Sequence, residues 1–256
     1  MTLARRSGEI LIGILPIAAI VALWHAIAAS GIAPAAILPP PFAVFTRLAQ
    51  QFGNPQFLGN AGITLFRLFA GFSIALVVGV GLGLAATGSR TVESLVKPLV
   101  RVLAPLPKVA LYPAMVLILG FDDASKIALV AADAVFPILL ATYQGTSAVE
   151  PKLVWSARAA GTSQRAVLFK IVLMAALPSV LTGCRIGLII SCIVVFLAEM
   201  ITSTDGLGYL LVRASRNFQT VDMFVPLISI SILGLTLNAA FNMLRAYLLR
   251  GFPEER

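Results

Sequence analysis

Long apolar runs alternate with short polar stretches along the whole chain. An α-helix rises about 1.5 Å per residue, so roughly 20 consecutive apolar residues are needed to cross about 30 Å of hydrocarbon. Runs of this kind occur six times. The six predicted spans are residues 10–29, 65–86, 99–119, 125–143, 179–201 and 223–244. The pattern predicts an all-α fold, namely a polytopic membrane bundle of about six transmembrane helices that forms a single domain over residues 1–256.

Two of these spans carry further local signals. Pro105, Pro107 and Pro113 interrupt the third span, and proline removes a helical hydrogen bond, so we expect that helix to be kinked. Gly79 and Gly83 in the second span form a small-residue pair four positions apart, which favours close packing against a neighbouring helix.

The composition supports an integral membrane protein. Of 256 residues, 59% are hydrophobic and 12% are charged, and the mean hydropathy is +0.97. Soluble domains carry about twice that share of charge. This excludes a soluble nucleotide-binding domain and a secreted disulfide scaffold. Cys184 and Cys192 lie in one apolar span, where we expect buried thiols and no metal site.

The net charge of +8 indicates orientation rather than nucleic-acid binding, because the basic residues are spread between the spans. Cytoplasmic loops of membrane proteins are enriched in Lys and Arg. With a cytoplasmic N-terminus, twelve basic residues lie inside and five outside, so both termini are predicted to be cytoplasmic. The twelve are Arg5, Arg6, Arg90, Lys97, Arg101, Lys152, Arg158, Arg165, Lys170, Arg245, Arg250 and Arg256, and the five are Arg47, Arg67, Lys126, Arg213 and Arg216.

The loop between the fourth and fifth spans, residues 147–178, has the pattern of folded structure. Pro151 suits the first turn of a helix, and residues 152–160 contain no helix breaker. Gly161 is typical of a left-handed helix C-cap, and Thr162 or Ser163 can cap a second helix that continues over 165–176. The pattern predicts two short helices joined at Gly161, either as a docking element for a soluble partner or as an amphipathic surface helix without one.

This loop resembles the "EAA" motif of permeases of binding-protein-dependent ABC importers. That motif reads Glu-Ala-Ala, three residues, Gly, nine residues, Ile, one residue and Leu-Pro. Aligned on Gly161, the chain matches at Ala157, Ile171 and Leu173. It departs from the motif at Trp155, which replaces the glutamate, and at Met174, which replaces the proline.

Further segments resemble the nitrate/sulfonate/taurine/bicarbonate branch of this family, in order, over roughly residues 38–245. The matching segments are Arg67-Leu68-Phe69-Ala70-Gly71-Phe72, Pro105-Leu106-Pro107, Tyr112-Pro113, Ser125-Lys126-Ile127, Ala176-Leu177-Pro178, Thr182-Gly183-Cys184-Arg185, Ala198-Glu199 and Gly206-Leu207-Gly208. No single segment is specific, whereas the ordered set is.

The resemblance implies a permease with the type I ABC importer fold in a bacterial inner membrane. It implies a homodimer, two copies of a cytoplasmic ATPase that hold ATP and Mg, a periplasmic or lipid-anchored solute-binding protein, and no cofactor or enzymatic activity on this chain. The sequence contains no P-loop motif. The ATPase-coupling residues implied are Trp155, Ser156, Ala157, Ala160, Gly161, Thr162 and Ser163. The branch implies a small anion such as a sulfonate, taurine, nitrate or bicarbonate as cargo, with thiamine-precursor, riboflavin-like or aromatic carboxylate cargo as open alternatives.

Ionisable residues inside the spans are candidates for the translocation pathway or its gate, because they are costly in lipid. Asp133 lies in the fourth span, and Glu199 and Ser191 lie in the fifth. The structural alternatives are a contact of Asp133 with Lys108 or Arg185, and a role for Glu199 in holding the loop that follows it. The functional alternative is a proton-coupled secondary transporter that uses Asp133 and Glu199.

Overall fold

The computed structural model describes residues 3–34 and 36–252, with side chains from Leu15 onwards. This part of the chain is helical apart from turns and one isolated β-bridge between Arg250 and Phe252. The elements are α1 (Leu3–Ser30), α2 (Pro41–Gln51), α3 (Pro55–Gly88), α4 (Arg90–Leu103), the 3-10 helix η1 (Lys108–Leu111), α5 (Tyr112–Leu119), α6 (Asp123–Ser147), α7 (Pro151–Ala159), α8 (Gln164–Val167), the π-helical turn η2 (Leu168–Val172), α9 (Leu173–Ala175), α10 (Leu177–Thr202), α11 (Leu207–Arg216) and α12 (Thr220–Leu248).

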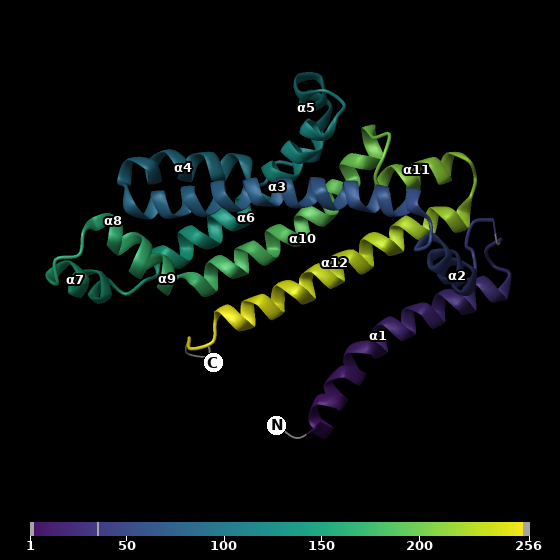
Figure 1. Ribbon diagram of the computed structural model, residues 1–256, viewed down its shortest axis with the longest axis horizontal. Coiled ribbons are helices and arrows are strands. Elements are labelled where there is room, and N and C mark those ends of the chain that lie inside the picture. Colours follow the sequence, from purple (N-terminus) through teal and green to yellow (C-terminus); the bar gives the residue numbers. More distant parts are fainter. Residues whose placement is uncertain (1–2, 35, 253–256) are drawn as a thin grey trace.

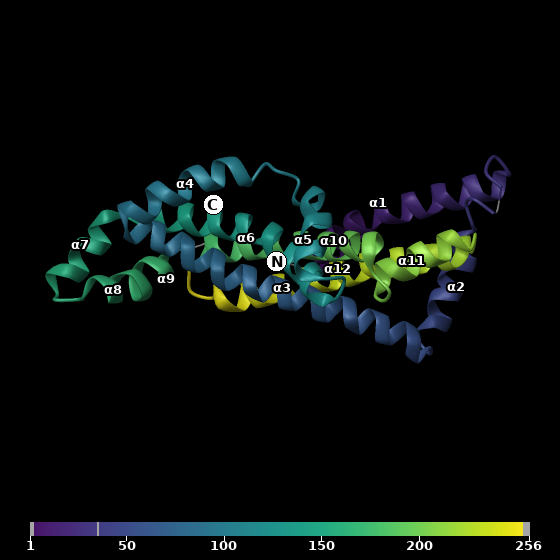
Figure 2. The same ribbon diagram turned by 90° about the horizontal axis from the view of Figure 1, so that it is seen from above.

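Four long helices, α3, α6, α10 and α12, run along the long axis of the molecule (Figure 1). Each is long and apolar enough to cross a membrane, and they contain the predicted spans 65–86, 125–143, 179–201 and 223–244. Residues 147–178, called the elbow below, lie at one end of the bundle, whereas α2 and α11 lie at the other end (Figures 1 and 2). The predicted all-α membrane bundle is confirmed, and its two ends differ in structure.

The third predicted span is interrupted at its prolines, as expected, but by a sharp break between two helices in place of a kink within one. The chain forms α4 and the η1–α5 segment, which are bent by 86° across residues 104–107. Pro105 and Pro107 lie in this break, and neither supplies the backbone N–H that a continuous helix requires. Counted as one broken span, the pair raises the number of spans among the described residues to five.

The first predicted span lies in α1, which is set apart from the bundle (Figure 1). The apolar stretch with described side chains, Leu15–Ser30, is shorter than a membrane span. Trp24 holds α1 to the rest of the chain: its indole nitrogen donates to the Pro39 carbonyl at 3.0 Å, and its ring stacks on Phe224 of α12 at 5.5 Å. Of the basic residues counted for orientation, Arg256 and the side chains of Arg5 and Arg6 lie outside the described residues.

Small residues allow α3 to approach α6 closely. A Cβ added at Gly79 would lie 2.9 Å from Ile138 Cβ, and one at Gly83 would lie 2.7 Å from Thr142 Cβ, both closer than side chains tolerate. The predicted packing role of these glycines is confirmed. Both cysteines are buried thiols, as expected.

Candidate functional site

The elbow begins with α7, which ends at the predicted glycine. Pro151 occupies the first turn, where its missing N–H costs no hydrogen bond. Gly161 adopts φ 81°, its N–H bonds to the Arg158 carbonyl at 3.0 Å, and the Thr162 N–H bonds to the Ala157 carbonyl at 3.0 Å. These two hydrogen bonds form a Schellman cap, in which the left-handed position favours glycine. The predicted C-cap at Gly161 is confirmed.

The second half of the elbow starts from Ser163, whose side-chain oxygen accepts from the Ala166 N–H at 3.4 Å. Of the two predicted caps, Ser163 is therefore the one that caps α8. The helix continues through the π-helical turn η2 and through α9 before α10 begins at Leu177. The predicted pair of short helices is present, and the second contains a π turn that the sequence pattern did not indicate.

The elbow is packed against the ends of the long helices. Val167 and Val172 are buried with Leu84 of α3, and Val154 and Leu168 pack around them. Gly88 at the end of α3 leaves room for Leu168, since a Cβ there would lie 2.7 Å from the Leu168 side chain. The elbow is therefore in direct contact with α3, and the chain itself joins it to α6 and α10.

Most of the surface of α7 is exposed in the part of the chain that the structure describes. No residue of α7 is buried, and Trp155 is 68% exposed. A cavity of about 310 Å³ lies beside Trp155 and Arg158, between the elbow and the ends of α3 and α6. Among the predicted coupling residues, Ala157 and Thr162 are half-buried, whereas the others are exposed; these are Trp155, Ser156, Ala160, Gly161 and Ser163.

Asp133 forms an ion pair in the middle of the bundle. It lies ten residues into α6, about 15 Å from the start of that helix. Its carboxylate is 3.2 Å from Lys108 Nζ, and that ammonium also donates to the Ala104 and Leu106 carbonyls at 3.2 and 3.3 Å. Lys108 thus satisfies carbonyls left open at the α4 break, and Asp133 neutralises it.

Of the two structural partners expected for Asp133, the contact with Lys108 is confirmed. The contact with Arg185 is absent, because Arg185 Nε donates to Asn238 Oδ1 at 2.9 Å instead. Ser191 is buried, and its hydroxyl donates to the Gly187 carbonyl in its own helix at 2.8 Å. Asp133, Ser191 and Glu199 therefore have separate sets of partners.

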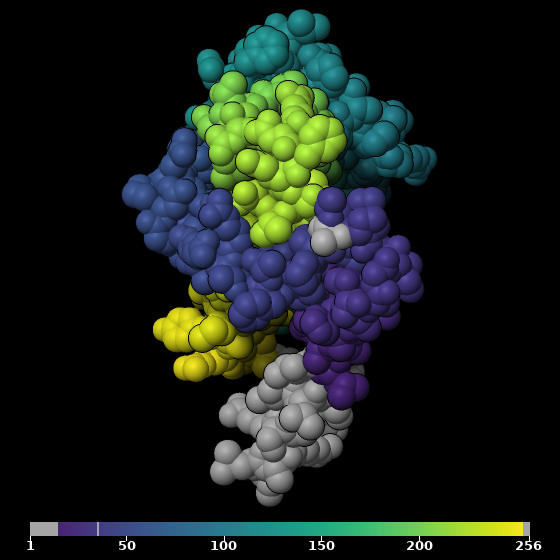
Figure 3. All heavy atoms as spheres, turned by 90° about the vertical axis from the view of Figure 1, so that its right-hand side faces the viewer, coloured from purple at the N-terminus to yellow at the C-terminus, as the bar shows by residue number. Residues whose placement is uncertain are grey.

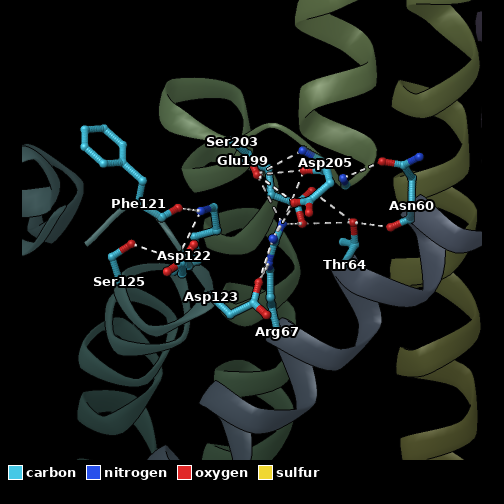
Figure 4. A network of polar contacts seen from close by, with 12 residues as sticks. Asn60, Thr64, Arg67, Phe121, Asp122, Asp123, Ser125, Glu199, Ser203 and Asp205 are labelled. Carbon is cyan, nitrogen blue, oxygen red and sulfur yellow. Dashed lines mark hydrogen bonds and ion pairs between the residues drawn. The ribbon is translucent and has the colours of Figure 1, made fainter. Parts of the chain in front are cut away.

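Glu199 belongs to a buried polar network at the end opposite the elbow (Figure 4). Its carboxylate accepts from Arg67 Nη1 at 2.9 Å, from Thr64 Oγ1 at 2.9 and 3.0 Å, and from the Gly208 N–H at 3.0 Å. Arg67 and Glu199 are 2% and 1% exposed. Arg67 also pairs with Asp123, at 2.6 Å, and with Asp205.

The network fixes the turn between α10 and α11. Asn60 Oδ1 accepts from the Gly206 N–H at 2.7 Å, and Thr64 Oγ1 accepts from the Leu207 N–H at 2.9 Å. Gly206 has φ 96°, and a Cβ on it would collide with the Glu199 carboxylate. The expected structural role of Glu199, to hold the loop that follows it, is confirmed.

Asp205 lies in this turn outside the long helices. Burial by itself would raise the pKa of Asp205, but hydrogen bonds from Arg67 and its positive charge outweigh burial and lower that pKa. Asp205 is therefore ionised at neutral pH and is a third counterion of Arg67, beside Glu199 and Asp123. Sequence reasoning did not assign Arg67 to this site. The signal was an arginine within the predicted span 65–86, because such a cation needs acidic partners, here Asp123 at the start of α6 and Asp205 in the turn before α11.

None of the described residues form a group of three or more His, Cys, Asp or Glu side chains that could hold a metal ion. The described side chains therefore present two kinds of feature: an exposed elbow at one end, and buried ion pairs within the bundle and at the other end.

The chain is similar to transport proteins of known family. The family model for the "binding-protein-dependent transport system inner membrane component" matches residues 75–252. A putative aliphatic sulfonates transport permease protein of Bacillus subtilis is 30% identical over 238 residues, covering 93% of this chain and 86% of the relative. The taurine transport system permease protein of Escherichia coli is 27% identical over 244 residues, covering 93% and 89%.

A solved structure agrees with the fold. An inward-facing form of the MetNI methionine ABC transporter aligns with a TM-score of 0.66 at 18% sequence identity, over 75% of this chain and 96% of the matched chain. At this identity the match supports the fold alone. Together with the family match and the relatives, it shows that the chain belongs to the binding-protein-dependent transport system inner membrane components and is an ABC importer permease.

Proposed function

We propose that two copies of this chain form the membrane conduit of an importer, and that a separate cytoplasmic ATPase, in two copies, binds the elbow of each. The observation that carries the proposal is the construction of the elbow: Val167 and Val172 fix it to the bundle, whereas Trp155 is 68% exposed and lines an open cavity between the elbow and the ends of α3 and α6. The chain is then one permease domain over residues 1–256, with residues 147–178 as its coupling loop.

The orientation proposed places the elbow and both termini in the cytoplasm. Lys152, Arg158, Arg165 and Lys170 lie in the elbow, and an excess of basic residues marks cytoplasmic segments. The C-terminal end of α12 lies towards the elbow end of the bundle (Figure 1). The end that carries α2 and α11 then faces the exterior, where a solute-binding protein delivers the cargo.

In this proposal the ATPases supply the free energy, with ATP and Mg bound to them, and this chain converts their movement into a change of access. Trp155, Ser156, Ala160, Gly161 and Ser163 present the contact surface, and Ala157 and Thr162 close the cap that shapes it. Because the elbow joins α6 directly to α10, a displacement of α7 moves both helices.

We propose a small anion, an organic sulfonate such as taurine first of all, as the cargo. The relatives named above are permeases for aliphatic sulfonates and taurine, which supports this class. Glu199 is proposed to act at the outer gate through the turn that it holds, and Asp133 and Ser191 to act beside the pathway. The alternative of proton-coupled transport is disfavoured because the carboxylates of Asp133 and Glu199 are already paired with Lys108 and Arg67.

The test uses the complete complex in proteoliposomes, with uptake of a labelled sulfonate and ATP hydrolysis measured together. Substitution Gly161→Ala strains the cap at φ 81° and should lower uptake per ATP hydrolysed several-fold. Gly31→Ala is the matched control, because Gly31 has φ 73° and open space around it but lies outside the elbow. Equal coupling in Gly161→Ala and Gly31→Ala contradicts the elbow as the ATPase contact, and proton-driven uptake without ATP contradicts the importer itself.

A further inference from the structure

A polar cavity lies at the end opposite the elbow, where α2 and the start of α3 meet α11 and the start of α12. Its volume is about 260 Å³, and its walls include Arg47, Gln51, Asn54, Arg213, Gln219 and Asp222. Figure 3 looks onto this end and shows the yellow-green atoms of the α11 region against the blue atoms of α2 and α3. Cavities of this polarity in an apolar chain are candidates for recognition of a polar partner.

The charges of this cavity do not balance. Arg47 pairs with Asp222 at 2.6 Å, so these two residues compensate each other. Arg213 lies over the ring of its neighbour Tyr209 at 5.7 Å and forms no ion pair with any residue that the structure describes. Arg216, one turn further along α11, is exposed as well. Arg213 is thus an uncompensated positive charge in the cavity wall, and Arg216 adds a second exposed positive charge on the same helix; both are complementary to an acidic group.

An exposed aromatic side chain directly precedes one of the cavity-lining residues in the chain, Gln219. Phe218 is 93% exposed and has φ 56°, a conformation that bulky residues rarely adopt. It directly follows Asn217, the C-cap residue of α11; the Phe218 N–H bonds to the Ser215 carbonyl at 3.1 Å and the Gln219 N–H bonds to the Ala214 carbonyl at 2.9 Å. Glycine is the favoured residue at such a cap. A strained, solvent-exposed phenylalanine in this position contributes nothing evident to the fold of its own chain.

We propose that this surface, made of Arg213, Arg216, Phe218 and the adjoining cavity, is where an acidic face of the solute-binding protein docks. Arg and aromatic side chains are the usual anchors of protein interfaces, and a cavity next to an exposed aromatic residue matches the arrangement of an anchor beside a pocket. Phe218 would insert between side chains of the partner while a carboxylate of the partner meets Arg213. The inference rests on the proposed function, since that function supplies the partner.

The polar character of the cavity favours a protein over lipid as the occupant. Four side-chain amides line it, namely Gln51, Asn54, Gln56 and Gln219. Amides both donate and accept hydrogen bonds, so they can pair with the polar groups of a protein surface. The turn that carries Phe218 lies at the extremity of the molecule, beyond the long helices (Figure 1). In the proposed orientation it faces the aqueous exterior.

The experiment measures the Kd of the solute-binding protein that supports uptake, in its cargo-loaded form, for the complex in nanodiscs. Phe218→Gly removes the aromatic ring and relieves the strain at the cap, so an unfolding temperature at or above that of the unmodified protein shows that the fold is kept. We expect Phe218→Gly and Arg213→Gln each to weaken binding about tenfold or more, as anchor residues do. Arg213→Gln should also reduce the dependence of Kd on salt.

Phe121→Ala is the matched control, because Phe121 is another exposed aromatic at the same end and points away from the network in Figure 4. Its Kd should equal that of the unmodified complex. An unchanged Kd in Phe218→Gly and Arg213→Gln overturns the docking surface, and so does an equal loss in Phe121→Ala. If uptake occurs but needs no binding protein, the proposed function fails instead, and the two failures are distinguishable.

Discussion

The ion pair between Arg67 and Glu199 is predicted to be a major stabilising contact of this end of the molecule. Replacing Arg67 by methionine keeps a long side chain but leaves the Glu199 carboxylate, which is 1% exposed, without its cation. Removing one partner of a buried pair typically costs about 3–5 kcal/mol. Since Thr64 and Gly208 still donate to Glu199, the expected cost lies towards the lower end of that range.

The comparison pair is Arg47 with Asp222, which has a similar separation of 2.6 Å but a 42% exposed arginine side chain. Exposed pairs contribute about 0–1 kcal/mol, so Arg47→Met should be nearly neutral. The two arginines differ in burial and also in the number of their counterions, because Arg67 pairs with Asp123 and Asp205 as well as with Glu199. Both differences predict a larger loss of stability for Arg67→Met.

The assay is thermal unfolding of the purified protein in detergent. For a chain of this size about 1 kcal/mol corresponds to roughly 2–4 °C in the unfolding temperature. Arg67→Met should therefore lower that temperature by about 6–12 °C, and Arg47→Met by less than about 4 °C. Glu199→Gln should cost less than Arg67→Met, because Arg67 retains Asp123 and Asp205. Equal shifts for Arg67→Met and Arg47→Met refute the reasoning.

Three further outcomes are expected. Gly83→Ala should lower stability by about 1–3 kcal/mol through its clash with α6, whereas Gly81→Ala, which meets open space, should be neutral in the same unfolding assay. Lys108→Met should be strongly destabilising, because it leaves the Asp133 carboxylate unpaired. The double variant Lys108→Met, Asp133→Leu should recover most of the lost stability, since no buried charge remains unpaired. If the losses of stability of the two single variants simply add in the double variant, the ion pair is contradicted. The pKa of Asp205 is lowered, so the stability that its ionised carboxylate contributes is present at neutral pH and is lost as pH falls through that lowered pKa. Protease cleavage near residues 203–208 should therefore increase at such low pH. Asp205→Asn should remove this dependence of cleavage on pH.

Local signals in the sequence were sufficient to predict the secondary structure of the elbow. Pro151, Gly161 and Ser163 each act on the backbone within a few residues of themselves, so their positions alone predict where the two short helices begin and end. The apolar runs likewise predicted α3, α6, α10 and α12, because length and hydropathy decide whether a helix spans a membrane.

Local sequence signals did not predict the contacts between segments that are distant in the chain. Arg67 meets Asp123, Glu199 and Asp205, which are 56, 132 and 138 residues away in the chain. No periodicity in one segment determines which of several acids such a cation meets. The prolines predicted the interruption after α4 but not its angle of 86°, since proline indicates a break in a helix and not the direction that the chain takes after it.

The separation of Arg67 from Glu199 has a consequence for biogenesis. Ribosomes add about 5–20 residues per second, so the glutamate emerges roughly 7–26 s after the arginine, which precedes it by 132 positions. During this interval the guanidinium lacks its buried counterion Glu199 while α3 is already entering the bilayer, although Asp123 follows it by only 56 positions. Because Arg67 lies near the start of the apolar stretch, its guanidinium can extend to the aqueous boundary of the membrane and remain hydrated until Glu199 is available. Burial of the arginine is therefore a late event, completed only when the fifth predicted span has been synthesised and inserted.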